Sequence, residues 1–382
     1  MLIFITIKRR FFMWTAALIV SGILLMTFSN FKTDEVSAIF TNGAWDALSV
    51  FEKEEVADQV LGIIKMRSNA ILVGNMEVVK SLFDTSTKYG TWAYEHEVKK
   101  AKYLQRWSDK QGVKFIDINP SIKVRYGKEK GTGFTVNFIA STEYKYVYEN
   151  EPDIINSFRI GTYHIFDLME KNDQWLITRE WYTDPFADSL NLDNIKSQEI
   201  KNHILAATAR DFSDLNERRK NAISYAEQYC GSASEEQYGF QYNKNYRDYN
   251  PQGGDCANFA SQVLFEGGKF KKNRTWNYDK GGATKAWVNA QSFKNYMMNS
   301  GRASKIAYGT YDQVYKQAYK LLPGDFVAYE KRGKVTHISV VTGADSKGYS
   351  MVSCHNTDRN KVPWDLGWSN KGIKFWLIRV HY

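Results

Sequence analysis

Hydrophobic residues follow two different periods along the first half of the chain. Between Trp45 and about residue 110 they recur with the period of a helix, and from Gly112 to about residue 182 they alternate with polar residues. The first period predicts helices and the second predicts strands. Strands that follow helices are typical of an α+β domain in which a curved antiparallel sheet packs on helices. We therefore predict such a domain over residues 45–190.

A polar and charged stretch, residues 191–214, comes next and is interpreted as a linker that turns helical. Beyond it, residues 218–229 and 256–264 have helical patterns, whereas the β-branched segment 335–343 predicts a central strand. Residues 215–382 are therefore predicted to form a second α+β domain.

The N-terminal end carries an uncharged run, residues 11–28, directly after Lys8-Arg9-Arg10. Its length is close to the roughly 20 apolar residues that a helix needs to cross a bilayer, and the basic flank predicts a cytoplasmic N-terminus. We predict a transmembrane anchor within residues 1–33, which makes this a single-pass cell-membrane protein with the rest of the chain extracellular. The alternative is a signal peptide cleaved after Val36-Ser37-Ala38, and the protein would then be secreted.

The charge balance is basic. The 382 residues include 51 Lys and Arg against 42 Asp and Glu, which gives a formal net charge of +9. A basic balance favours anionic partners such as cell-wall polymers or lipid headgroups. The basic residues are scattered, without an RNA-binding signature or a basic helix, so we predict no nucleic-acid partner.

The chain contains three cysteines, Cys230, Cys256 and Cys354, and no C-x-x-C motif. This pattern matches neither a disulfide framework nor a zinc motif, so we predict no metal and no cofactor. An odd count leaves at least one thiol free in a monomer, and the sequence leaves open whether Cys230 and Cys354 pair.

Cys256 stands where a helix is expected to begin. It follows Gly253-Gly254 and Asp255, a good N-cap residue, and apolar residues at the third, fourth, seventh and eighth positions after it define one helical face. A thiol at a helix start feels the positive end of the helix dipole, which favours the nucleophilic thiolate. The alternative is that Cys256 is a small buried hydrophobe.

Two downstream segments can complete a catalytic site. His337 lies in the predicted central strand, and a hairpin with the next strand places it opposite His355 or Asn356, depending on the register. A thiol nucleophile, an imidazole base and a polar group that orients the base are the parts of a cysteine hydrolase. We predict Cys256 as the nucleophile and His337 as the base, with His355 or Asn356 as the orienting group.

A zinc site is the competing interpretation of these residues. Its ligands would be Cys256, His337, Cys354 and His355. Because Cys354 and His355 are neighbours on a strand, their side chains point to opposite faces, which disfavours a shared metal ion. Cys354 is accordingly predicted to be structural.

Residues 215–382 resemble the putative amidase domain family of Gram-positive bacteria, a papain-like relative of the CHAP and NlpC-type cysteine peptidases. The resemblance is carried by Asp255-Cys256-x-Asn258-Phe259-x-Ser261-Gln262, by Trp287-Val288-Asn289 and by His337 in its strand. The family continues with a His-Thr pair, where this chain has His355-Asn356. The resemblance implies a papain-like α+β fold and cysteine-dependent amide hydrolysis.

Residues 45–190 resemble the cone-shaped, nuclear-transport-factor-two-like domains in the order of their elements and in the closing segment Trp175–Phe186. Some members of that superfold are enzymes that use polar residues inside the cone. His164, Asp167 and Glu180 are the corresponding candidates here. A spacer or binding module is the expected role of this domain.

These observations lead to one functional hypothesis and several alternatives. We expect an extracytoplasmic cysteine amidase or peptidase that hydrolyses amide bonds, with peptidoglycan as the substrate. The alternatives are a cysteine protease or transpeptidase acting on proteins, an amidase for small amides, and a non-catalytic cell-wall-binding protein.

Overall fold

A computed structural model describes residues 50–172, 174–186, 197–368 and 372–382. Residues 54–382 form one compact unit with a mixed architecture of helices and antiparallel strands. The predicted anchor and the alternative cleavage site lie outside the described residues and stay predictions. Among the described helices, none is both long enough and apolar enough to cross a membrane.

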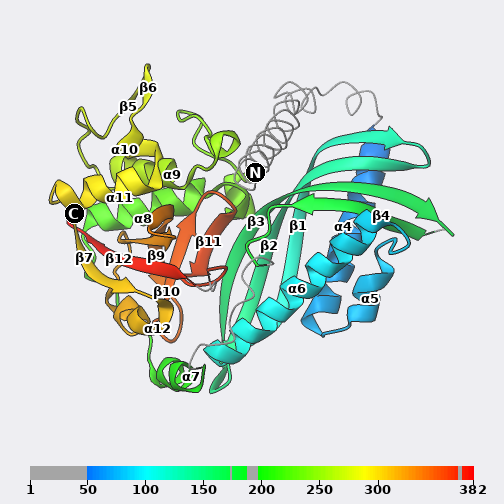
Figure 1. Cartoon of the computed structure of the whole chain (residues 1–382), viewed down its shortest axis with the longest axis horizontal. Coiled ribbons are helices and arrows are strands. Elements are labelled where there is room, and N and C mark those ends of the chain that lie inside the picture. The colour runs from blue at the N-terminus through cyan, green and yellow to red at the C-terminus, as the bar shows by residue number, and fades with distance from the viewer. Residues whose placement is uncertain (1–49, 173, 187–196, 369–371) are drawn as a thin grey trace, which may run out of the picture. The chain divides into compact units, whose positions relative to one another are not determined.

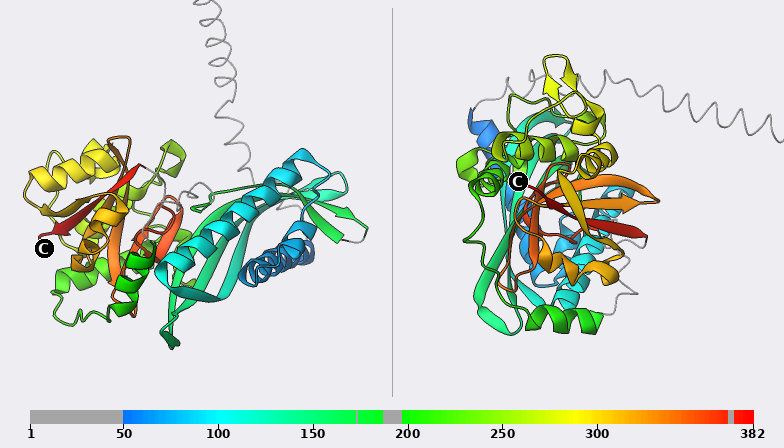
Figure 2. Two further views of the ribbon diagram at one scale, coloured as in Figure 1. Left: turned by 60° about the horizontal axis from the view of Figure 1, so that its bottom comes forward. Right: turned by 90° about the vertical axis from the view of Figure 1, so that its left-hand side faces the viewer.

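The first region begins with helices and continues with strands, as the sequence predicts (Figure 1). Its elements are α4 (Val50–Leu72), α5 (Met76–Ser81), α6 (Lys88–Gln111), β1 (Val113–Lys130), β2 (Gly133–Tyr148), β3 (Glu151–Lys171) and β4 (Gln174–Tyr182). The Thr87 hydroxyl accepts the Gly90 N–H at the start of α6, and Gly112 ends the helix with a φ of 69°. The predicted change from helix to strand at Gly112 is therefore confirmed. The four strands form an antiparallel meander, and α6 packs across it (Figures 1 and 2).

The second region mixes short helices with strands. Its helices are α7 (Ser197–Ala206), α8 (Glu217–Tyr229), α9 (Cys256–Gln262), α10 (Lys285–Val288), α11 (Ala290–Asn299) and α12 (Tyr311–Val314). Its strands are β5 (Tyr278–Asp279), β6 (Gly282–Ala283), β7 (Ala303–Gly309), β8 (Phe326–Lys331), β9 (Lys334–Ala344), β10 (Ser350–Cys354), β11 (Asp358–Pro363) and β12 (Ile373–Val380). A π-helical turn, Val263–Gly267, continues α9 directly. The predicted helices at 218–229 and 256–264 and the predicted strand at 335–343 match α8, α9 and β9.

One sheet joins the two regions. Its strands follow the order β1-β2-β3-β11-β10-β9-β8-β12-β7, and β4 pairs with β3 beside this path. The connection between the regions is the antiparallel pairing of Asp358–Asn360 in β11 with Arg159–Gly161 in β3. Gly161 also lets Ser232 approach β3 closely, because a Cβ at residue 161 would lie 2.1 Å from the Ser232 hydroxyl oxygen. The predicted domain ranges 45–190 and 215–382 stay an interpretation of the sequence, and in the structure they share a sheet.

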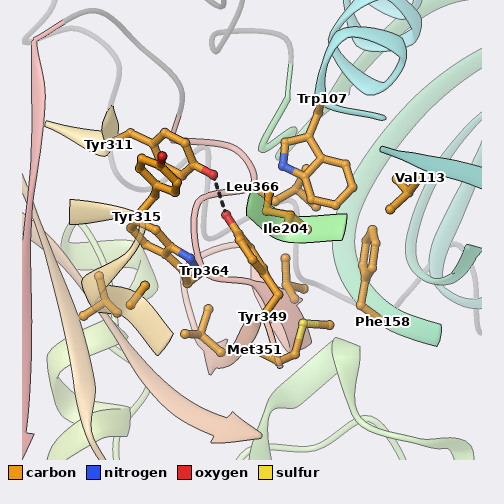
Figure 3. Packing of buried hydrophobic residues seen from close by; sticks show 14 of the residues in the cluster. Trp107, Val113, Phe158, Ile204, Tyr311, Tyr315, Tyr349, Met351, Trp364 and Leu366 are labelled. Carbon is orange, nitrogen blue, oxygen red and sulfur yellow. Dashed lines mark hydrogen bonds between the residues drawn. The ribbon is translucent and has the colours of Figure 1, made fainter. Parts of the chain in front are cut away.

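A hydrophobic core also spans both regions (Figure 3). Trp107 and Phe158 of the first region pack in it with Tyr349 and Trp364 of the second. Burying this much aromatic surface is strongly favourable. A buried carboxylate, Asp365, lies against this core and bonds to Tyr349.

The Asp365 carboxylate ties α6 to the second region. It accepts hydrogen bonds from the Trp107 indole N–H at 3.3 Å and from the Tyr349 hydroxyl at 2.8 Å, and it pairs with Lys110. The Tyr349 hydroxyl also lies 2.8 Å from the Tyr311 hydroxyl, as the dashed line in Figure 3 marks. A buried carboxylate needs such partners, so these bonds give the two regions a defined relative position.

Candidate active site

Cys256 is the first residue of α9 and is 5% exposed. Helix α9 is buried along its whole length and packs on β9. Burial raises the pKa of the Cys256 thiol to about 12, although the backbone N–H groups of Ile338 and Ala257 at the sulfur work against this rise. Burial thus outweighs the helix start, and Cys256 is a neutral thiol in this arrangement rather than the thiolate that its position suggested.

Asp255 occupies the N-cap position of α9, as predicted, but its side chain holds other partners. One carboxylate oxygen accepts the backbone N–H of Tyr249 at 2.9 Å and the side-chain amide of Asn258 at 2.8 Å. The other oxygen lies 2.6 Å from Nδ1 of His355. Asp255 therefore connects the loop before α9 with the end of β10.

His355 is completely enclosed by these groups. Its Nδ1 meets Asp255, its Nε2 lies 2.7 Å from the Tyr229 carbonyl oxygen, and its ring stacks between Tyr242 and Phe259 at centroid distances of 3.9 and 4.2 Å. Both ring nitrogens face oxygens that only accept hydrogen bonds, so both must carry protons. Although burial opposes the charge, Asp255 and the Tyr229 carbonyl raise the pKa of His355. His355 is therefore an imidazolium that is fixed in place.

His337 lies in a different environment. Its Nε2 is 3.2 Å from the Cys354 sulfur, and its ring packs on Trp368 at 4.9 Å and on Tyr329 at 5.5 Å. Burial and the charge of Arg359 hold the pKa of His337 well below its usual value. The imidazole is therefore neutral, which is the form that a general base needs.

Cys256 and His337 lie on opposite faces of the sheet. Ile338 and Val340 belong to a second hydrophobic core, which also contains Cys256. His337 is paired across the strands with Tyr329, which belongs to the core that spans both regions. Side chains of consecutive strand residues point to opposite faces. The structure thus places His337 beside Cys354. It does not bring His337 into the contact with Cys256 that the sequence predicts.

The register between β9 and β10 explains where Asn356 and His355 go. Val352 and Ser353 pair with Val341 and Val340, the register that would place Asn356 opposite His337. However, β10 ends at Cys354, and Asn356 turns the chain with a φ of 70°. Asn356 then lies beside Gly254, where a Cβ would be 3.0 Å from its side-chain nitrogen. His355 projects to the α9 side, so neither residue orients His337 here.

Sequence reasoning missed two partners, Asp255 for His355 and Cys354 for His337. The strand pattern contained a signal for the second, because Cys354 shares a face with Asn356, the residue that the register places opposite His337. All three cysteines, Cys230, Cys256 and Cys354, lie in the described residues and are free thiols, so the pairing of Cys230 with Cys354 is not formed.

The proposed zinc ligands do not converge. Cys354 and His337 lie on one face of the sheet, whereas Cys256 and His355 lie on the other. Within the residues that the structure describes, no three His, Cys, Asp or Glu side chains are close enough together to hold a metal ion.

The polar candidates of the first region separate into two places. His164 Nδ1 lies 3.0 Å from Glu180, and Glu180 also pairs with Arg67 at 2.6 Å. Arg67 and His164 also line a cavity of about 20 Å³, room for roughly one water molecule. Asp167 lies elsewhere on the sheet, where it pairs with Lys130. The structure therefore brings His164 and Glu180 together but leaves Asp167 out.

Comparison with known proteins finds a family to which the second region is similar. Residues 216–378 match the family described as "Putative amidase domain", which confirms the resemblance of residues 215–382 to that family. The match supports an amidase-type hydrolase that acts on C–N bonds.

A particular relative is a Bacillus subtilis (strain 168) protein named "Uncharacterized protein YjcM". It is 33% identical over 163 residues, which make up 40% of this chain and 36% of that protein. The chain therefore matches about a third of the length of this relative.

Proposed function

We propose that the second region is a papain-like cysteine amidase in which Cys256 is the nucleophile. The observation that carries this proposal is the place of Cys256 within the matched segment. The thiol begins a buried helix, and its sulfur receives the N–H of Ile338, the residue that follows His337. The peptide group that joins His337 to Ile338 is thus beside the Cys256 sulfur.

The proposed reaction follows from the two protonation states. The neutral thiol of Cys256 loses its proton to the neutral imidazole of His337 as the sulfur attacks the amide carbonyl carbon. The imidazolium then returns the proton to the leaving nitrogen as the C–N bond breaks, which leaves a thioester on Cys256. Water hydrolyses the thioester with His337 again as the base. This chemistry requires the His337 ring to face α9.

His355 has a positioning role in this proposal. As a fixed imidazolium it neutralises Asp255, and Asp255 in turn holds the loop before α9 through Tyr249 and the helix through Asn258. We assign His355 to holding the start of α9, and Asn356 to the turn beside Gly254, rather than to orienting His337.

The proposed substrate is peptidoglycan, and the proposed place of action is the outer face of the cell membrane. The net charge of +9 suits an anionic wall, and the uncharged run at residues 11–28 suits an anchor. For the first region we propose the cone-shaped, nuclear-transport-factor-two-like fold, supported by the described helices α4, α5 and α6 before the meander of β1 to β4 and by the cavity between them.

The test is digestion of purified cell walls by the wild-type protein, by Cys256→Ala and by Cys230→Ala, with mass spectrometry of the released products. Cys230 is a matched control because it is also a buried free thiol. We expect new amino groups with the wild type and Cys230→Ala and none with Cys256→Ala. Equal release by all three proteins would refute the role of Cys256. Cleavage of a labelled protein while walls stay intact would favour the protease alternative.

A further inference from the structure

Strand β9 contains an extra residue directly before His337. Tyr329 pairs with His337 and the next residue of β8, Glu330, pairs with Val335, so that Thr336 is left over as a bulge. A bulge shifts the alternation of side chains by one position. Its place in the strand therefore decides the face to which the neighbouring residues point.

The two hydrophobic cores show the effect of this bulge. Val335 and Ile338 both belong to the core that contains Cys256, although they are three positions apart and regular alternation would separate them. With the extra residue at Thr336, His337 falls on the far face. If the extra residue followed His337 instead, His337 would alternate directly with Val335 and point toward Cys256. A shift of the bulge by one residue thus moves the imidazole from one face to the other.

Few contacts oppose this shift at Thr336 itself. Its side chain is exposed, and its hydroxyl makes a long hydrogen bond of 3.4 Å to the Tyr329 carbonyl oxygen. The contacts that hold the observed arrangement are instead made by His337, with the Cys354 sulfur at 3.2 Å and with the Trp368 ring. Burial raises the pKa of Cys354 to about 11, so it stays a thiol that can donate its proton to the neutral ring.

We propose that this structure is a resting form, in which Cys354 and the bulge at Thr336 hold the catalytic base away from Cys256. This inference rests on the proposed function. Activation moves the bulge past His337, so that Thr336 takes the far-face position and the imidazole reaches the thiol. Substrate binding favours the shifted form, because only in that form does the His337 imidazole lie beside Cys256, where it contacts the bound amide.

The first variant weakens the resting form. Cys354→Ala removes the hydrogen bond to His337, and Cys230→Ala removes another buried thiol as the matched control. Alkylation of Cys256 by iodoacetamide at pH 7 is followed by peptide mass spectrometry, which needs no substrate. We expect Cys354→Ala to raise the Cys256 alkylation rate roughly fivefold, the factor expected for one lost neutral hydrogen bond. Equal rates in Cys354→Ala and Cys230→Ala would overturn the proposal.

The second variant fixes the resting form. Deletion of Thr336 gives a strand without a bulge, in which Val335 points to α9 and His337 points away. We expect a folded protein that has lost both the amide hydrolysis and the pH 7 reactivity of Cys256. Wild-type hydrolysis by a folded deletion variant would contradict the proposal. If the deletion variant does not fold, the Cys354→Ala comparison decides alone.

The two readouts separate this inference from the proposed function. Wild-type protein that releases nothing from cell walls or other amides counts against the amidase, while the alkylation rates still report on the position of His337. Wild-type hydrolysis together with identical behaviour of Cys354→Ala and Cys230→Ala leaves the amidase in place and removes the resting form.

Discussion

Both regions of the molecule bury a histidine that meets a carboxylate and stacks between two aromatic rings. In the first region His164 lies 3.0 Å from Glu180 between Phe138 and Tyr182. In the second region His355 lies 2.6 Å from Asp255 between Tyr242 and Phe259. Despite this similarity, the pKa of His164 is lowered and that of His355 is raised.

The neighbours of each pair explain the difference. Burial lowers the pKa of His164 although Glu180 opposes it, and the positive charges of Arg67 and Lys100 act in the same direction as burial. Arg67 also pairs with Glu180 at 2.6 Å. Its Nε2 meets the Thr162 hydroxyl, which can donate a hydrogen bond to a neutral ring. The Nε2 of His355 meets a carbonyl oxygen instead, and the other partners of Asp255 are neutral N–H groups. Nearby charges add to this difference, because Arg67 and Lys100 lower the pKa of His164 whereas Asp358, together with Asp255, raises that of His355.

The largest expected effect comes from removing Arg67, the cation that neutralises Glu180 in the first region. Arg67→Met leaves Glu180 and Glu97, which lies 3.6 Å from Arg67, without their shared guanidinium. We expect a loss of about 3–5 kcal/mol in the free energy of unfolding, as for other broken buried ion pairs. The pKa of His164 should also rise, so that this histidine comes to resemble His355. Urea unfolding and NMR titration measure the two effects, and a loss below about 1 kcal/mol would show that the site is hydrated.

Removing the cation of the second pair should cost nearly as much. His355→Gln leaves the Asp255 carboxylate buried without a charged partner, which predicts a loss of about 3 kcal/mol. Because Asp255 holds the start of α9, wall hydrolysis should fall as well. His164→Gln is the matched control and should cost only about 1 kcal/mol, since Arg67 still neutralises Glu180. Equal losses in the two variants would contradict the assignment of charge.

The pH dependence separates the two histidines by sign. The stability that His355 contributes is fully present below its unfolded pKa of about 6.5 and is lost as the pH rises through its higher folded value. The contribution of His164 is present above about 6.5 and is lost as the pH falls through its lower folded value. In urea unfolding, the deficit of His355→Gln should shrink toward alkaline pH and that of His164→Gln toward acidic pH. The same trend in both variants would remove the contrast.

The smallest effect concerns the Thr162 hydroxyl. Thr162→Val keeps the shape of the side chain but leaves Nε2 of His164 without its 2.7 Å partner. We expect a loss of about 1 kcal/mol, typical of one neutral hydrogen bond, and unchanged wall hydrolysis. A fall in hydrolysis would instead connect the first region to the reaction.

Local features of the fold could be predicted from the sequence. The change of period at Gly112 and the helical face after Cys256 are short-range patterns, and both elements form as expected. The bulge at Thr336 could not be predicted in this way, because apolar residues on both sides of it satisfy a strand in either arrangement. One extra residue then moved His337 to the other face of the sheet.

Long-range partners were also beyond the sequence. Asp255 and His355 are a hundred positions apart, and their contact depends on where β10 ends and how Asn356 turns the chain. The pairing of β3 with β11 and the approach of Ser232 to Gly161 likewise join residues that are far apart in the sequence. Such contacts follow from the packing of whole elements rather than from local preference.

The most direct test of the central claim is to follow activity while the three thiols are alkylated. Wild-type protein is treated with iodoacetamide, and wall hydrolysis is compared with the modified fraction of Cys230, Cys256 and Cys354 in peptide mass spectra. We predict that activity falls in direct proportion to the modification of Cys256. Activity that survives complete alkylation of Cys256, or that falls with Cys354 while Cys256 stays unmodified, would contradict Cys256 as the nucleophile.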